Sequence, residues 1–333
     1  MKFINEDAGS RLFLIGNGFD IAHGYQTRYS DFARWIKEQT IYDDSRRWPF
    51  IPVYSKNSFG QGKSARNQLM KLLRHMFERL NRENAKDNWQ NFEESLFYLN
   101  IEIYHDAQTE DIITEEDGIT QEYLMELSEQ NADNLYTAVE HIPVLFSEWI
   151  ESVKLPLSQI SFGTDVICQK NGRCRAGDLF LTFNYTETLE QNYSVPANQV
   201  FHIHGFRKCN SKLIVGYSDL KNRIIKLSTF GGDYQYARKR LGEAMVLLKK
   251  DTSRVIQNNQ EFWHRLEHSN IHDIYSFGFS FSEIDLPYIA KTCSSLRDSE
   301  DCIWWLNPRD KPKSDRIIEA IVDCGFSGRF MYY

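Results

Sequence analysis

The sequence predicts an α/β fold in which a parallel, doubly wound sheet has helices on both faces and is interrupted by a large all-helical insertion. Three observations predict it. A short apolar run at residues 12–15 ends in a Gly-x-Gly turn, which is typical of the first buried strand of a parallel sheet. Strand-like runs alternate with helical patterns from residue 179 onward. Five of the apolar runs end in a glycine or a compact polar group, as nucleotide sites assembled from loops require.

The Gly-x-Gly turn is the element around which we expect the chain to be organised. A Cβ at Gly16 or Gly18 would stand in the way of a nucleotide diphosphate that lies against the backbone. The usual dinucleotide fingerprint is incomplete, because the next glycine is Gly24. The alternative interpretation is a strand-to-loop bend that needs a positive φ at one glycine.

Two serines are expected to cap helices. Ser30 precedes a helical pattern with apolar residues on one face. The sequence Gly62-Lys63-Ser64 imitates the end of a phosphate-binding loop, but the leading glycine of that motif would fall at Asn57. We therefore expect Ser64 to cap the next helix, after an irregular crossing at residues 41–62.

Helical periodicity dominates the middle of the N-terminal half. We expect residues 41–162 to form a mostly helical insertion, because apolar stripes at helical spacing recur there and each must be buried in a core. Residues 1–40 and 163–333 are expected to form the core around the sheet. The insertion would serve specificity or assembly.

Composition excludes several classes of protein. The net charge of −7 argues against a chain that grips nucleic acid through its whole surface. The polar, acidic N-terminus and the lack of a long apolar run predict a cytoplasmic protein with no membrane partner. Six cysteines without paired spacing predict reduced thiols and argue against structural zinc. They are Cys168, Cys174, Cys209, Cys293, Cys302 and Cys324.

Polar residues follow the expected strands at 179–183, 200–204, 274–277 and 303–306; a further strand is expected at 213–215. Ligands of open parallel sheets bind beyond the carboxyl ends of the strands, so these residues are the candidates for a site. They include Asn184, His204, Gly278, Ser280 and Asn307.

These residues carry a resemblance to a known family. The segment from Leu14 to Gly24, with Tyr-Ser-Asp-Phe at 29–32, closely resembles the opening of the AbiH family of bacteriophage abortive-infection proteins. The segments 181–186, 202–205 and 276–280 look like that family's later motifs. The order of the motifs is also similar to that of the sirtuins and their defence relatives, which implies a Rossmann-like, sirtuin-like core that binds NAD.

The resemblance implies roles for individual residues. The catalytic positions would be taken by Asn184 and His204. The NAD-binding residues would be Gly16 and Gly18 at the pyrophosphate, Gly278 and Ser280 at the phosphate or ribose, Asn307 at the adenine-side ribose, and Asn17 and Asp20, which replace small residues of the sirtuin turn. The four-cysteine zinc module of sirtuins is missing, which argues against protein deacylation. NAD hydrolysis is therefore the expected activity, with NAD as substrate and no metal.

The chemistry fits these residue types. Cleavage of the bond between nicotinamide and ribose passes through an oxocarbenium-like state, so one polar group to orient water or a ribose hydroxyl and one base suffice. We assign the first task to Asn184 and the second to His204, with His202 structural. Asp20 could add negative potential near the ribose. The alternatives are a capping box that begins at Asn184 and a histidine hydrogen-bonded beneath the sheet end.

Other functions stay open at this point. The chain could be a non-catalytic module that senses NAD or ADP-ribose and docks a partner. A toxin that targets nucleic acid would need a carboxylate cluster or a basic groove, and neither is apparent in the sequence. For an effector, the expected partners are a phage-derived or host trigger and either a second copy of the chain or another defence protein. We expect its basal activity to be low, since unrestrained NAD hydrolysis would harm its own cell.

Overall fold

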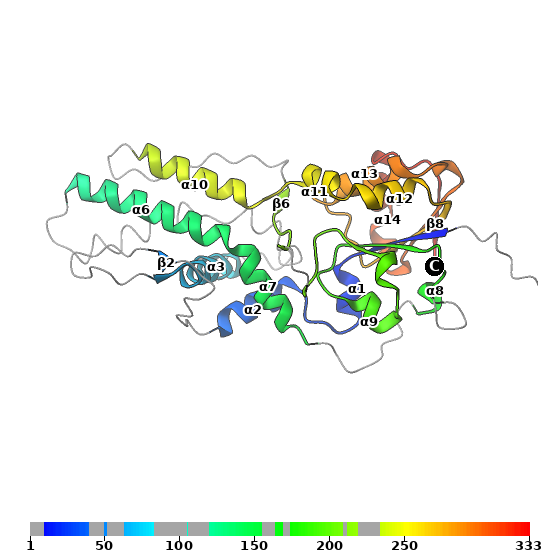
Figure 1. The fold of residues 1–333 in the computed structure, drawn as a ribbon, viewed down its shortest axis with the longest axis horizontal. Coiled ribbons are helices and arrows are strands. Elements are labelled where there is room, and N and C mark those ends of the chain that lie inside the picture. The colour runs from blue at the N-terminus through cyan, green and yellow to red at the C-terminus, as the bar shows by residue number, and fades with distance from the viewer. Residues whose placement is uncertain are drawn as a thin grey trace, which may run out of the picture. The chain divides into compact units, whose positions relative to one another are not determined.

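The structure is a computed structural model that describes residues 10–39, 50–51, 63–82, 105, 120–154, 164–168, 174–208, 212–218 and 234–333 (Figure 1). The chain divides into two compact units, each of which is described by itself. The first comprises Met1–Thr27, Ile150–Leu213 and Asp251–Tyr333, and the second comprises Arg28–Trp149 and Ile214–Lys250. Among the described helices, none is both long enough and apolar enough to cross a membrane.

The first unit contains a six-stranded sheet in which every neighbouring pair is parallel. This confirms the prediction of an α/β fold with a parallel sheet. Counted along the chain from one to six, the strands lie side by side in the order 6-5-4-1-2-3. They are β1 (Ser10–Ile15), β4 (Leu179–Thr182), β5 (Val200–His202), β8 (Ile271–Phe277), β9 (Ile303–Leu306) and β10 (Arg329–Tyr332).

The centre of the sheet is apolar on both faces. β1 lies between β4 and β8, with Leu12 opposite Leu179 and Leu14 opposite Leu181. The side chains of Leu12, Phe13 and Leu14 are fully buried, and Phe13 stacks on Phe180 with ring centroids 4.6 Å apart. Burial of each such side chain stabilises the fold by about 1.5–3 kcal/mol. The apolar run that was predicted as the first strand is thus a central strand of the core.

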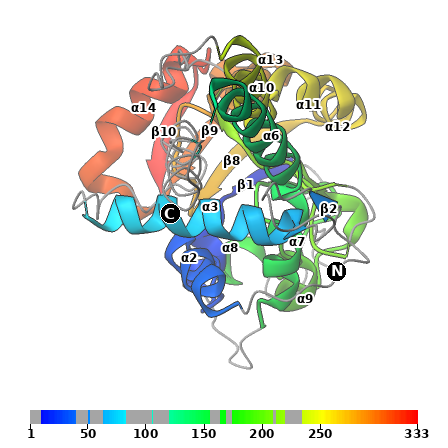
Figure 2. The same ribbon diagram turned by 90° about the vertical axis from the view of Figure 1, so that its left-hand side faces the viewer.

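Helices lie on both sides of this sheet (Figures 1 and 2). The helices are α1 (Asn17–Ala22), α8 (Thr164–Ile167), α9 (Thr188–Tyr193), α11 (Thr252–Asn258), α12 (Gln260–Glu267), α13 (Leu286–Ser295) and α14 (Ser314–Asp323), with 3-10 turns at Ala197–Gln199, Ser299–Asp301 and Pro308–Lys313. Helices α1, α8 and α9 pack against Phe13 and Ile15 on one face, and α11, α12 and α13 cover the other face.

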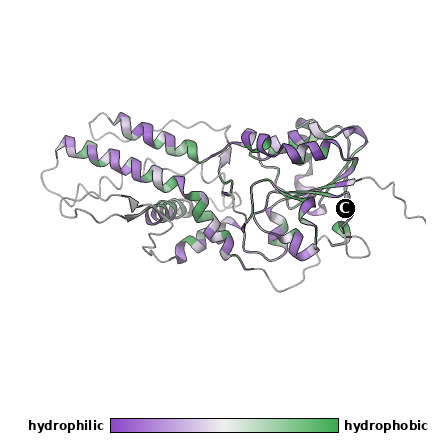
Figure 3. Cartoon of the chain, viewed as in Figure 1, coloured by the Kyte–Doolittle hydropathy of each residue, from purple (hydrophilic) through white to green (hydrophobic). Residues whose placement is uncertain are grey.

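The described part of the second unit is mostly helical. Two long helices, α6 (Gln121–Glu140) and α10 (Gln235–Leu247), pack side by side, each with a polar and an apolar face (Figure 3). The Arg240 guanidinium lies 3.5 Å from the Tyr136 ring centroid and donates to Asp133 at 2.7 Å, which ties α10 to α6. The other elements are α2 (Tyr29–Glu38), α3 (Ala65–Arg82), α7 (Ile142–Ser152, which runs into the first unit), β2 (Phe50–Ile51), β3 (Lys63–Ser64), β6 (Tyr217–Ser218) and β7 (Lys249–Lys250).

Three sequence predictions about local structure need correction. α2 begins at Tyr29 with Arg28 at its N-cap, so Ser30 lies inside the helix and does not cap it. The apolar run 213–215 is irregular backbone, since three residues are too few to distinguish a strand from a buried loop. β10 was not predicted; it is an edge strand of the sheet, and most of it is exposed.

The prediction for Ser64 is confirmed. Its Oγ accepts a hydrogen bond from the Arg66 backbone N–H at 3.3 Å, at the start of α3. Gly62 and most of the predicted crossing at 41–62 lie outside the described residues. The predicted division into a core at 1–40 and 163–333 and an insertion at 41–162 stays a prediction.

Candidate functional site

The loops that follow β1, β4, β5 and β8 meet at the carboxyl edge of the sheet. Backbone hydrogen bonds extend the sheet by one residue, from Phe183 N to Ile15 O at 2.9 Å and from Ile203 N to Thr182 O at 3.1 Å. On the other side, Gly16 N donates to the carbonyl of Phe277 at 2.9 Å. These bonds bring together the glycine turn and the loops that hold Asn184, His204 and Gly278.

The glycine turn packs directly on the backbone of the loop after β8. A Cβ at Gly16 would lie 2.5 Å from the Gly278 oxygen, and one at Gly18 would lie 2.7 Å from the Gly278 Cα. Gly278 itself has φ +59°, and a Cβ there would lie 2.2 Å from Phe19 N. The amide of Gly18 donates to the Gly278 carbonyl at 2.9 Å. The close approach of two loops therefore accounts for these three glycines, and their contact with a pyrophosphate stays a prediction.

Asp20 is fully buried and binds the loop after β4. Its Oδ2 accepts from the Thr186 hydroxyl at 2.5 Å and its Oδ1 from the Thr188 hydroxyl at 2.6 Å. Loss of water on burial raises the pKa of this carboxyl above its ordinary value. The two hydroxyls, the nearby Asn184 side chain and the charge of His23 oppose that rise only in part. Both carboxylate oxygens hold the loop, and the NAD-binding role expected for Asp20 stays a prediction.

Asn184 is held by its backbone and not by its side chain. Its N–H donates to Thr182 Oγ1 at 3.1 Å, and its carbonyl lies 3.2 Å from His202 Nδ1. The residue is only 4% exposed, and its side chain lies close enough to Asp20 to lower the pKa of that carboxyl. Neither Nδ2 nor Oδ1, however, reaches a described residue with the length and angles of a normal hydrogen bond. A buried amide without a partner costs free energy, so this side chain is one that a ligand or a water could satisfy.

The capping-box alternative for Asn184 is not what the structure shows. α9 begins at Thr188 and has Glu187 at its N-cap, with no capping hydrogen bond from a side chain. The amide of Asn184 therefore does not serve the helix.

His204 follows β5 and is 3% exposed. Its ring lies edge-on to Phe183 and to Tyr288, with centroids 5.4 Å apart in both pairs, and 6.2 Å from the Tyr185 ring centroid. Phe183 also contacts Phe279 from the loop after β8, at 4.6 Å. The candidate base thus packs against aromatic side chains from the loop after β4 and from helix α13.

The neighbouring His202 has a different setting. Its Nε2 lies 2.9 Å from Glu190 Oε1 on α9, and its Nδ1 lies against the Asn184 carbonyl. Both ring nitrogens are therefore engaged within the protein, in keeping with the structural role that the sequence analysis assigned to His202.

The remaining candidates are more dispersed. Asn17 donates from Nδ2 to the Thr27 carbonyl at 2.8 Å. Ser280 is exposed and is followed by Phe281, which has a left-handed φ of +51°. Asn307 lies after β9, where its Oδ1 accepts from Arg309 N at 3.0 Å and begins a 3-10 turn.

Sequence reasoning missed the groups that organise the loop after β4. They are Thr186 and Thr188, which bind Asp20, and Glu187, which pairs with Arg207 at 2.6 Å. The only signal was the run of polar residues after the strand, because the partners lie 20 to 168 positions away in sequence.

The described residues offer no group of three or more His, Cys, Asp or Glu side chains that could hold a metal ion. Their five cysteines are free thiols, and burial raises the pKa of Cys293 to about 12 and that of Cys302 to about 11. Cys209 lies outside the described residues. These thiols are protonated at neutral pH and are poor nucleophiles.

Comparison with known proteins gave one match. A family model described as bacteriophage abortive infection AbiH matches residues 12–307. The matched range begins in β1 and ends at Asn307, so it includes every candidate residue of the site. No curated protein and no solved structure matched the chain.

Proposed function

The chain belongs to the AbiH family of bacteriophage abortive infection proteins, and we propose that it acts in abortive infection by hydrolysing NAD to nicotinamide and ADP-ribose. The reaction depletes NAD in the infected cell. The family supports the role in defence, and the site at the carboxyl edge of the sheet supports the choice of substrate.

The strand order supports a dinucleotide ligand. Read from β5 to β10, the order 3-2-1-4-5-6 is that of doubly wound dinucleotide-binding sheets, which bind their ligand where the order reverses. That point lies between β1 and β8, beside the glycine turn and Gly278. A Rossmann-like, sirtuin-like core is part of the proposal.

The observation that carries the proposal is the buried amide of Asn184. The polypeptide on both sides of it is fixed, but the amide makes no hydrogen bond to a described residue. Burial of such a group costs free energy unless a ligand or a water hydrogen-bonds to it. Its position after β4 suits contact with a ribose hydroxyl or the attacking water.

The reaction needs few groups. The water oxygen bonds to the ribose C1′ while the bond from C1′ to the nicotinamide nitrogen breaks, and nicotinamide leaves as a neutral molecule with the electron pair. His204 accepts the proton that the water loses, and Asn184 orients the water or a ribose hydroxyl. The negative charge of Asp20, when it is ionised, stabilises the positive charge that develops on the ribose.

Access to these groups requires a rearrangement. Asn184 is 4% exposed and His204 is 3% exposed, so the aromatic side chains that pack on His204 must move before a substrate enters. Phosphate contact at Gly16 and Gly18 would also replace the bonds that their amides make to Phe277 and Gly278. We therefore propose that basal turnover is low and that a phage-derived or host trigger, or assembly with a second copy or another defence protein, opens the site.

The test is release of nicotinamide from NAD by the purified full chain. We expect Asn184→Ala and His204→Ala to abolish release, and His264→Ala, an exposed histidine on α12, to retain it. Binding of NAD without release would favour a sensor instead. If the wild-type chain neither releases nicotinamide nor lowers NAD in phage-infected cells, the enzymatic function is wrong.

A further inference from the structure

Arg207 is a buried arginine that links two loops of the site. It is 6% exposed, and its Nε donates to Glu187 Oε2 at 2.6 Å. Its Nη1 donates to the Val153 carbonyl at 2.7 Å, and its backbone N–H donates to the Tyr185 carbonyl at 2.8 Å. The guanidinium thus holds one side chain and one carbonyl, and the amide holds a second carbonyl.

The two linked loops are those that carry the candidate catalytic residues. Arg207 follows His204 by three positions, and Glu187 follows Asn184 by three positions. The turn after His204 is tight, with Gly205 at φ +79°. A shift of Arg207 would therefore move the Asn184 loop and the His204 loop relative to one another.

The Glu187 carboxylate is kept ionised for this link. Burial by itself would raise its pKa, but hydrogen bonds from Arg207 and from Lys208, whose Nζ lies 3.0 Å from Oε1, lower the pKa below its ordinary value. The pair is nearly dry, with the two side chains 5% and 9% exposed. A charge-assisted hydrogen bond in such a setting has a narrow range of geometries.

The same loop is fixed from its other side. Asp20 accepts hydrogen bonds from Thr186 and Thr188. Arg207 donates to the residues that alternate with them, Tyr185 and Glu187. The amide of Asn184 lies near the Asp20 carboxylate but makes no hydrogen bond of normal geometry to a described residue. Fixing a loop while one group on it stays available is how a site is preorganised.

We propose that Arg207 is a positioning residue, which fixes the Asn184 loop against the His204 loop through Glu187 and the Tyr185 carbonyl. The inference rests on the proposed NAD hydrolysis and adds to it a residue that touches no substrate. Misplacement of reacting groups by about 1 Å can cost about 100-fold in rate, so loss of Arg207 should act on turnover.

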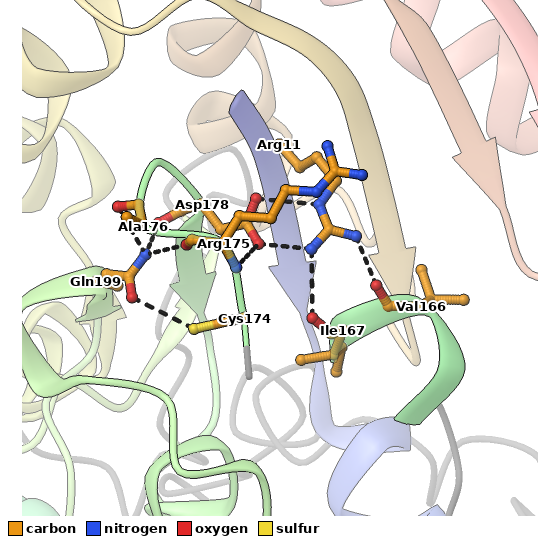
Figure 4. A network of polar contacts seen from close by, with 8 residues as sticks. All are labelled: Arg11, Val166, Ile167, Cys174, Arg175, Ala176, Asp178 and Gln199. Atoms are coloured by element: carbon orange, nitrogen blue, oxygen red, sulfur yellow. Dashed lines mark hydrogen bonds and ion pairs between the residues drawn. The ribbon is translucent and has the colours of Figure 1, made fainter. Parts of the chain in front are cut away.

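The chain contains a matched control in Arg11 (Figure 4). Arg11 is also a buried arginine, with Nη2 2.6 Å from Asp178 Oδ2 and Nη1 2.6 Å from the Val166 carbonyl. It lies near the start of β1, and the site lies after the end of that strand, four residues further on at Ile15. At about 3.3 Å per residue, Arg11 is on the order of 13 Å from the end of β1, and the glycine turn begins at the next residue.

The experiment compares Arg207→Gln, Arg207→Lys and Arg11→Gln in the full chain, with kcat and KM measured from nicotinamide release and normalised to the folded fraction from circular dichroism. We expect Arg207→Gln to lower kcat by about 100-fold, with less than about a threefold change in KM. Arg207→Lys, which restores the charge next to Glu187, should recover part of the loss. Arg11→Gln should keep kcat within about threefold of wild type at a comparable loss of thermal stability.

The outcomes separate the two proposals. Wild-type release of nicotinamide with unchanged kcat in both Arg207 variants overturns the positioning role alone. Equal losses of kcat in Arg207→Gln and Arg11→Gln at equal folded fraction also overturn it, because the effect would then be general destabilisation. If Arg207→Gln does not fold, the milder Arg207→Lys decides on the same criteria. If the wild-type chain releases no nicotinamide and NAD stays constant in phage-infected cells, the proposed function is overturned and this inference with it.

Discussion

Replacement of Asn184 by leucine separates a functional amide from a structural one. Leucine has nearly the shape of asparagine but carries no polar atoms in its side chain. The two amide atoms are buried and make no hydrogen bond to a described residue, and an unsatisfied buried polar group costs about 1–3 kcal/mol. Asn184→Leu should therefore raise the free energy of unfolding by about 1–2 kcal/mol while it abolishes NAD hydrolysis.

The measurement is urea and thermal unfolding of the full chain, with nicotinamide release assayed on the same samples. For a unit of roughly 150–250 residues, such as the first unit, each kcal/mol in the free energy of unfolding corresponds to about 2–4 °C in Tm. Asn307→Leu serves as the comparison for stability, because Asn307 is also buried but its Oδ1 accepts from Arg309 N. That variant should lose about 1 kcal/mol, as expected for a lost cap.

If Asn184→Leu is destabilised as much as Asn307→Leu, the Asn184 amide does not have the functional role proposed for it. The amide would then contribute to folding, and the observation that carries the proposed function would have a structural explanation. Retention of full NAD hydrolysis by Asn184→Leu would equally refute the assignment of a catalytic role.

Three further predictions concern the loops and the burial of the site. Gly278→Ala should lower the free energy of unfolding by about 2–5 kcal/mol, because a Cβ at φ +59° would lie 2.2 Å from Phe19 N. Gly242→Ala in α10, where a Cβ meets open space, should raise it by about 0.5–1 kcal/mol. Equal effects of the two substitutions in urea unfolding would contradict this. Since burial raises the pKa of Asp20, the folded state binds its proton more tightly, and the stability from this group is greatest at acid pH and is lost as pH rises through the raised pKa. The stability of Asp20→Asn relative to wild type should therefore increase from acid to neutral pH, and a decrease would show that the pKa is lowered. Purified wild-type chain should turn over NAD slowly, because the candidate catalytic side chains are 3–4% exposed; rapid constitutive release of nicotinamide would mean that the site is open in solution.

Strand ends were predictable from the sequence because local patterns determine them. The apolar run at 12–15 is buried on both faces, as expected for a central strand of a parallel sheet. Asn184 and His204 each lie two residues after the end of a strand, β4 and β5. The glycine turn was also located correctly. The reason for its glycines is tertiary, since the backbone that excludes a Cβ belongs to Gly278, about 260 residues later.

Partners far apart in sequence could not be predicted from one chain. Asp20 and Thr186 are 166 positions apart, and nothing near Asp20 indicates that its carboxylate would bind two hydroxyls. α10, for example, packs along α6 in the second unit, about 100 residues away in sequence. An apolar stripe shows that a helix is buried without showing against which neighbour.

Small differences in backbone conformation explain the remaining errors. The start of α2 depends on Arg28, whose φ of −73° and ψ of 154° place it just outside the helix. The backbone N–H of Arg28 donates to the carboxylate of Asp31 in the first turn of the helix. Serine is favoured at such positions, but Ser30 lies two residues too late.

The central claim is that this protein removes NAD through the buried Asn184 amide, and NAD in phage-infected cells tests it most directly. Cells that express wild-type chain or Asn184→Leu are sampled through infection, and NAD, nicotinamide and ADP-ribose are quantified by mass spectrometry. We expect NAD to fall and ADP-ribose to rise before lysis in wild type only. Growth arrest by the wild-type chain at constant NAD, or equal loss of NAD with both proteins, would contradict the claim.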